Sequence, residues 1–139
     1  MIHGFWVMVV ISIFSGLLST MNIWVDNISD LGVSLNDLYM VLLMTGWMIL
    51  FMGLYEMDKQ CIIYGAIVVI LMLCCIRYQV LVRKTQYYTG MIPHHSMAIL
   101  MSKNLLENDG TLGENEKKFV NNIIAVQENE IKWMKNHLT

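Results

Sequence analysis

The sequence has few charged residues and no block of basic ones. Charged residues make up 14% of the 139 positions, and nine Lys and Arg against eleven Asp and Glu give a net charge of -2. Proteins that bind nucleic acid need clustered Lys and Arg to neutralise phosphates, so this class is excluded. A hydrophobic share of 56% is instead typical of a membrane protein.

Motifs of the common enzyme classes are also missing. The sequence has no Ser-His-Asp grouping, no phosphate-binding loop, no HExxH and no Glu-x-x-His motif of di-iron bundles. Cys61, Cys74 and Cys75 form no CxxC pair, and no CxxCH motif is present for haem attachment. We therefore expect a binding protein that carries out no covalent chemistry, and not an enzyme.

Basic residues are concentrated in the C-terminal part of the chain. No Lys or Arg precedes Lys59, whereas seven of the nine lie from Arg83 onward. Residues 1–82 are nearly continuous apolar sequence, and residues 83–139 have the polar, periodic pattern of helices that face water. We expect a three-span transmembrane region over 1–82 and a helical hairpin over 83–139.

Three apolar runs are candidates for membrane spans. The first, Gly4–Val25, has 22 residues without a formal charge, and a helix of that length, about 33 Å, would cross the hydrocarbon core. A cleaved signal peptide is the alternative for this run, but no Lys or Arg precedes it. Leu38–Tyr55 and Cys61–Ile76 are the second and third spans, with residues 78–82 completing the last turns of the third.

The connections between the spans suggest where the helices begin and which side they face. Asn36 or Asp37 is expected to cap the second span, and the short connection 56–60 makes the second and third spans antiparallel. Basic residues flank the end of the third span, and only Lys59 lies near its start. By the positive-inside rule, the C-terminal hairpin is cytoplasmic and the N-terminus lies outside.

The C-terminal part predicts two helices joined by a turn. The first runs from Pro93 to about Glu107, with proline in the first turn; alternatively, the third span continues through Tyr87 and Tyr88 and kinks at Pro93. The turn at 108–110 ends this first helix. Thr111 with Glu114 resembles a capping box that opens a second helix to about His137.

Sulfur and nitrogen side chains share one side of each of these predicted helices. At about 100° per residue, Met91, His94, Met97, Ala98 and Met101 gather on the first helix, with His95 on the flank, and Ile123, Gln127, Glu130, Met134 and His137 share a side of the second. A single Met is usually packing. Adjacent His residues beside three Met residues predict a metal site, lined chiefly by His94 or divided between the two flanks.

The ligand types favour copper over zinc. Thioether sulfur selects soft ions such as Cu(I), and imidazole suits copper as well as zinc. Zinc sites prefer thiolate, imidazole and carboxylate, and the hairpin has no cysteine. We therefore expect copper, with Cu(I) favoured, as the bound ion.

The motif GMIPHH at residues 90–95, followed by Met97, Ala98 and Met101 and then by QENEI at 127–131 and Met134, resembles the ferritin-like domain of unknown function 305 family. The resemblance covers about residues 85–138. It implies copper binding by Met91, His94, His95, Met97, Met101, Gln127, Glu130 and Met134, to which His137 is added here. Family members are commonly exported and longer ones hold two hairpins, whereas this chain has three spans and one hairpin.

Two helices cannot bury their apolar faces alone, so the fold expected is an all-α membrane protein whose hairpins complete a four-helix bundle as a homodimer or higher homo-oligomer. The leading hypothesis is a membrane-anchored protein that sequesters Cu(I) or hands it on, with the lipid bilayer and a copper donor or acceptor protein as partners. The alternative is a structural membrane component or interaction module of a larger complex, in which the metal motif is incidental.

Overall fold

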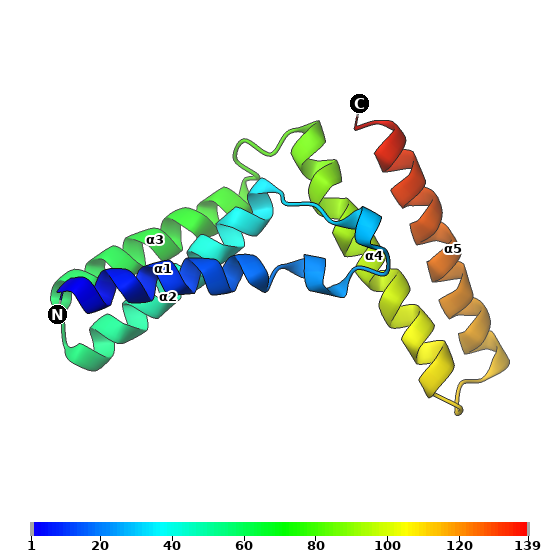
Figure 1. Cartoon of the computed structure of the whole chain (residues 1–139), viewed down its shortest axis with the longest axis horizontal. Helices are drawn as coiled ribbons and strands as arrows, with labels where there is room; N and C mark the ends of the chain where they lie inside the picture. The colour runs from blue at the N-terminus through cyan, green and yellow to red at the C-terminus, as the bar shows by residue number, and fades with distance from the viewer. Residues whose placement is uncertain (1, 139) are drawn as a thin grey trace. The chain divides into compact units, whose positions relative to one another are not determined.

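The computed structural model describes the backbone of residues 2–138 and the side chains of residues 5–138. Over this range the chain is helical, without strands, as the sequence predicts. It divides into one compact unit of the residues up to Thr20 with Ser34–Val82, and a second of Met21–Val33 with the residues from Arg83 onward. The elements, coloured along the chain in Figure 1, are α1 (Ile2–Leu18), η1 (Met21–Trp24), η2 (Ile28–Asp30), α2 (Leu35–Glu56), α3 (Lys59–Arg77), α4 (Lys84–Asn108) and α5 (Glu114–Asn136).

The first unit consists of the three apolar helices α1, α2 and α3. The segments Phe5–Trp24, Leu35–Glu56 and Lys59–Arg77 are long and apolar enough to cross a membrane. Most of their side chains face outward, since only 6%, 33% and 17% of the three segments are buried within the protein. An apolar exterior of this extent is suited to lipid and not to water.

Small residues let α2 and α3 approach each other closely. A Cβ atom added to Gly65 of α3 would lie 2.5 Å from the Leu50 nitrogen, and one added to Gly53 of α2 would lie 2.6 Å from the Ile62 nitrogen. Helices that meet in lipid commonly use glycine at such contacts, because the backbones can then pack directly. The α2–α3 interface therefore leaves no room for larger side chains at these positions.

The cap of α2 differs from the prediction. Ser34, not Asn36 or Asp37, is the N-cap residue, and its hydroxyl accepts the Asp37 N–H while the Asp37 carboxylate accepts the Ser34 N–H at 2.8 Å. This reciprocal pair satisfies two backbone donors at once, which explains why the helix begins three residues earlier than an Asp37 cap would allow.

The end of α3 also corrects the prediction that residues 78–82 continue the third span. The helix ends at Arg77, and Gln79 and Leu81 have positive φ angles of 48° and 58°. The Tyr39 hydroxyl donates a hydrogen bond to the Val80 carbonyl at 2.7 Å. This contact with α2 holds the chain in a turn, so α3 does not continue into α4 through Tyr87 and Tyr88.

In the second unit, α4 and α5 form an antiparallel hairpin (Figure 1). Helix α4 begins at Lys84, so Pro93 lies inside the helix. The prediction that Pro93 occupies the first turn is therefore wrong. The hydrophobic core between the helices contains Ile92, Ile99, Ile131 and Met134. This core brings the two histidine- and methionine-bearing segments side by side.

The turn between α4 and α5 is built differently from the predicted capping box. Thr111 does not open α5 but bonds through its N–H to the Asp109 carboxylate, at 2.9 Å. Gly113 occupies the N-cap position, and the Glu116 carboxylate accepts the Gly113 N–H at 2.7 Å. The predicted role of Glu114 is therefore taken by Glu116.

Candidate metal centre

His95 of α4 and Glu130 of α5 are the polar pair at the centre of the hairpin. The Nδ1 atom of His95 lies 3.0 Å from Oε2 of Glu130. The His95 side chain is 13% exposed, whereas the Glu130 side chain is 50% exposed. The His95 imidazole is thus enclosed between the helices, and the Glu130 carboxylate lies on its solvent-exposed side.

The Nδ1 atom of His95 has no hydrogen-bond partner at suitable geometry among the described residues, although the Glu130 oxygen is near. A buried nitrogen that is left unpaired costs free energy comparable to that of a lost hydrogen bond. A cation that Nδ1 and the carboxylate could share would satisfy both atoms.

A pocket of about 210 Å³ surrounds this pair. Each helix contributes two donor residues one turn apart, Met91 and His95 from α4 and Glu130 and Met134 from α5. The remaining lining residues are the aromatic Tyr87, Tyr88 and Trp133. Two thioethers, one imidazole and one carboxylate therefore border one cavity.

The aromatic residues of the pocket were not anticipated from the sequence. Tyr88 and Trp133 meet edge to face, with ring centroids 5.7 Å apart, and link α4 to α5. Both follow the helical spacing of the donors, since Tyr88 precedes Met91 by three residues and Trp133 follows Glu130 by three. That spacing is the signal that could have identified them.

The other predicted ligands lie away from this pocket or at its edge. His95, not His94, lines it, and His94 is exposed. Ser96, directly after His95, is fully buried. The remaining four residues are half-buried Met97 and Gln127, exposed Met101, and exposed His137, whose ring stacks on Trp133 with centroids 4.0 Å apart.

The donor set suits a soft cation. Among residues 2–138, no three His, Cys, Asp or Glu side chains lie together as a metal-binding group. The pocket instead combines one such pair with the thioethers of Met91 and Met134. Zinc prefers thiolate, imidazole and carboxylate ligands, whereas thioethers select Cu(I). The residues present therefore fit Cu(I) better than Zn²⁺.

Burial lowers the pKa of His95 below its ordinary value of 6.5. Desolvation is the largest cause, and the nearby Glu130 carboxylate opposes it by favouring the charged form. His95 is consequently neutral at pH 7 and keeps a nitrogen lone pair available for a metal ion.

NMR titration of the His95 ring should show a midpoint below 6.5. The unfolded chain takes up this proton at higher pH than the folded protein, so the second unit should lose stability as the pH falls through about 6.5. Replacing Glu130 with Gln should lower the midpoint further, because Glu130 raises this pKa. A midpoint at or above 6.5 in the unaltered protein would contradict the buried placement of His95.

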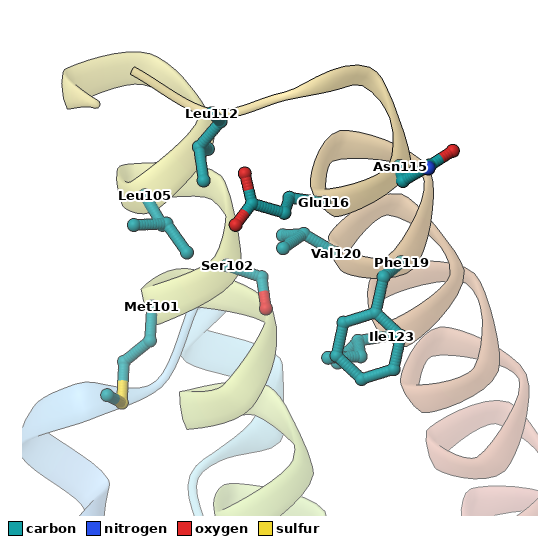
Figure 2. A pocket seen from close by; sticks show the side chains of 9 residues that line it. All are labelled: Met101, Ser102, Leu105, Leu112, Asn115, Glu116, Phe119, Val120 and Ile123. Atoms are coloured by element: carbon teal, nitrogen blue, oxygen red, sulfur yellow. The ribbon is translucent and has the colours of Figure 1, made fainter. Parts of the chain in front are cut away.

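A second and larger pocket of about 710 Å³ lies between α4 and α5 near the turn that joins them (Figure 2). Its lining is mostly apolar and contains one acidic residue, Glu116. The residues are Met101, Ser102, Leu105, Leu112, Asn115, Glu116, Phe119, Val120 and Ile123. Of the predicted metal ligands among the described residues, Met101 alone borders this pocket.

Comparison with known proteins identifies the domain that carries the site. Residues 80–138 match the family described as Domain of unknown function (DUF305). The chain is 42% identical over 136 residues to "Uncharacterized protein L153" of Acanthamoeba polyphaga mimivirus, a match that covers 94% of this chain and 88% of the viral protein. No solved structure matches the chain. The chain belongs to the DUF305 family, through the domain that contains the α4–α5 hairpin.

Proposed function

We propose that this protein is a membrane-anchored copper-binding protein that holds Cu(I) between α4 and α5, with Met91, His95, Glu130 and Met134 as ligands. The observation that carries the proposal is the placement of the buried Nδ1 atom of His95, which lies 3.0 Å from the Glu130 carboxylate without hydrogen-bond geometry, in a pocket bordered by two thioethers. Neutral imidazole and thioether sulfur are both ligands that Cu(I) accepts.

The role proposed is to sequester the ion or pass it to a partner, and not to catalyse a reaction. Among the described residues, the pocket is lined by one imidazole, one carboxylate, two thioethers and the aromatic rings of Tyr87, Tyr88 and Trp133. The exposed Glu130 side chain leaves one side of the pocket open, so a copper donor or acceptor protein could reach the ion without unfolding of the hairpin.

A competitive titration with a chromophoric Cu(I) chelator tests the proposal. The full chain in mild detergent should remove one Cu(I) per hairpin from the chelator, and His94→Ala with His95→Ala should abolish this. Met57→Leu provides a methionine control, because Met57 is 82% exposed and lies in the α2–α3 connection. If the unaltered protein removes no Cu(I) from the chelator, the proposal of copper binding is refuted.

We further propose that two hairpins associate as a homodimer or higher homo-oligomer in a four-helix bundle of ferritin-like type. Phe119, Val126 and Trp133 of α5 are 66%, 41% and 53% exposed, which is unfavourable for a hairpin in water. Chemical crosslinking in mild detergent should yield dimers or larger species, and a product that is only monomeric would contradict the association.

For the membrane orientation, we propose a cytoplasmic hairpin and an external α2–α3 connection. The support is the position of Arg77, Arg83 and Lys84 at the C-terminal end of α3. In a chain with its native cysteines replaced, Cys introduced at exposed Met57 should react with an impermeant thiol reagent on intact cells. Cys at exposed Lys118 should react only after the membrane is opened. The reverse labelling pattern would invert the orientation.

The larger pocket favours a second candidate function, an interaction module of a larger complex. The apolar space beside Phe119 and Val120 could receive an apolar side chain from a partner protein (Figure 2). A chain that binds no copper but forms a stable complex lost on Phe119→Ser would favour this function over metal binding.

A further inference from the structure

The connection between α1 and α2 contains a buried acidic residue, Asp30. Its side chain belongs to η2 and is almost completely buried, with 6% of the residue exposed. A buried carboxylate is costly unless it is paired and hydrogen-bonded, so its partners show what holds this connection in place.

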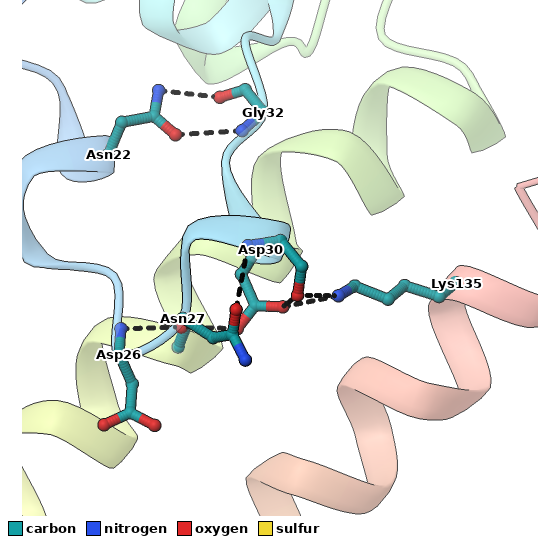
Figure 3. A network of polar contacts seen from close by, with 8 residues as sticks. Asn22, Asp26, Asn27, Asp30, Gly32 and Lys135 are labelled. Carbon is teal, nitrogen blue, oxygen red and sulfur yellow. Dashed lines mark hydrogen bonds and ion pairs between the residues drawn. The ribbon is translucent and has the colours of Figure 1, made fainter.

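Asp30 contacts both helices of the hairpin. One carboxylate oxygen accepts a hydrogen bond from the hydroxyl of Ser96 on α4 at 2.6 Å. The other oxygen lies 2.6 Å from Nζ of Lys135 on α5 (Figure 3). Ser96 is fully buried and also accepts the Asp26 N–H at 2.9 Å. Asp30 therefore bridges the two helices.

The bridged residues are neighbours of the metal-site residues. Ser96 directly follows His95 in α4, and Lys135 directly follows Met134 in α5. A change in the separation of Ser96 and Lys135 would move His95 and Met134 with them, because each pair shares one helical backbone. The Asp30 bridge therefore joins α4 and α5 at positions next to the residues that line the pocket.

The backbone near Asp30 is itself fixed. The Asn22 side chain makes two hydrogen bonds to Gly32, accepting its N–H at 2.9 Å and donating to its carbonyl at 2.8 Å (Figure 3). A Cβ atom at Gly32 would lie 2.8 Å from the Thr89 carbonyl, so the connection packs directly on α4. Asp30 is therefore presented from a braced segment and not from a loose loop.

We propose that Asp30 is a positioning residue for the metal site, setting the separation of α4 and α5 at which Met91, His95, Glu130 and Met134 border one pocket. This role rests on the proposed copper-binding function. A second acid of the same connection, Asp26, forms an ion pair with Lys103 of α4 at 2.6 Å and has no ion pair with α5 among the described residues. Asp26 is accordingly the matched control.

The experiment compares Asp30→Asn with Asp26→Asn in the full chain in mild detergent. Cu(I) affinity is measured by chelator competition, and helix separation is measured without copper from the NMR cross-peak between the Tyr88 ring and the Trp133 indole. Asp30→Asn should weaken Cu(I) binding by about tenfold or more, the effect expected when a residue supporting a ligand is lost. It should also weaken the cross-peak, and Asp26→Asn should change neither measurement.

The two measurements separate failure of this role from failure of copper binding. If the unaltered protein does not bind Cu(I), the cross-peak alone decides: its loss in Asp30→Asn supports the positioning role, and its retention overturns it. An unchanged affinity or cross-peak in Asp30→Asn, or equal losses in Asp26→Asn, would also overturn the role.

If Asp30→Asn fails to fold, a double variant tests the same role. Asp30→Asn with Lys135→Met removes both charges, so no lysine is left facing a neutral partner in a partly buried site. This variant also lacks the bridge, and it should show the same weaker Cu(I) binding and weaker cross-peak. Affinity and cross-peak equal to those of the unaltered protein would overturn the role.

Discussion

Replacing His95 with Gln should weaken Cu(I) binding by about 100-fold or more, at least as much as the loss of a residue that only supports a metal ligand. His95 contributes the imidazole of the pocket, and its neighbours there are two thioethers and a carboxylate. Gln retains the approximate size and polarity of the side chain but provides no imidazole nitrogen. Chelator competition with the full chain in detergent measures the change.

His94→Gln is the matched control for this substitution. The two histidines are adjacent in α4, but His94 is exposed and does not line the pocket. Its replacement should leave the Cu(I) affinity nearly unchanged. A larger loss in His94→Gln than in His95→Gln would show that the exposed imidazole is the ligand, and the assignment of the pocket would then be wrong.

Gly65→Val should destabilise the packing of α2 against α3 by about 3 kcal/mol, a typical cost of forcing extra atoms into a filled interface. Even a Cβ at this position would lie 2.5 Å from the backbone nitrogen and 2.7 Å from the Cα atom of Leu50. Backbone atoms cannot rotate away as a side chain can, so the helices must separate. Unfolding by a denaturing detergent, followed by circular dichroism, measures the loss.

Gly110→Val provides the control for the Gly65 substitution. A Cβ atom at Gly110, in the turn after α4, meets no atom of the described residues within 4 Å, and the φ angle of Gly110 is not positive. The free energy of unfolding should therefore change by only about 0.5 kcal/mol, as for other exposed sites. Equal effects of the two substitutions would contradict the close packing of α2 on α3.

The helices could be predicted from the sequence because apolar length and helical periodicity are strong local signals. Their ends depend on particular contacts that the sequence pattern does not contain. Helix α3 ends at Arg77, and the turn after it is held by the hydrogen bond from the Tyr39 hydroxyl to the Val80 carbonyl, a contact between residues far apart in sequence. Helix α2 begins at the Ser34–Asp37 pair, which matches a capping box that uses Asp in place of the usual Glu.

Pro93 illustrates how tertiary packing can override a local rule. Proline removes one backbone hydrogen bond and usually marks a helix start or a break. In this protein Pro93 is buried within α4, and a Cβ atom at Gly32 would lie 3.6 Å from its Cγ. Packing of the α1–α2 connection on Pro93 offsets the local cost, and this connection could not be placed on α4 from the sequence.

The residue types of the candidate site were predicted, but the orientation of α4 was not. Met91 with His95 and Glu130 with Met134 are spaced by one helical turn, which a sequence pattern reveals. Which histidine lines the pocket follows from tertiary contacts of α4 that the sequence pattern does not contain, such as those of the buried Ser96. Ser96 is buried because Asp30 and the Asp26 N–H bind its hydroxyl.

X-ray absorption at the copper edge of the Cu(I)-loaded full chain tests the ligand set most directly. Both sulfur and imidazole nitrogen should lie in the first coordination shell, from Met91, Met134 and His95. The sulfur contribution should fall in the Met91→Leu and Met134→Leu variants and persist in Met101→Leu, whose side chain borders the other pocket. A shell without sulfur, or sulfur lost only in Met101→Leu, would contradict the proposed centre.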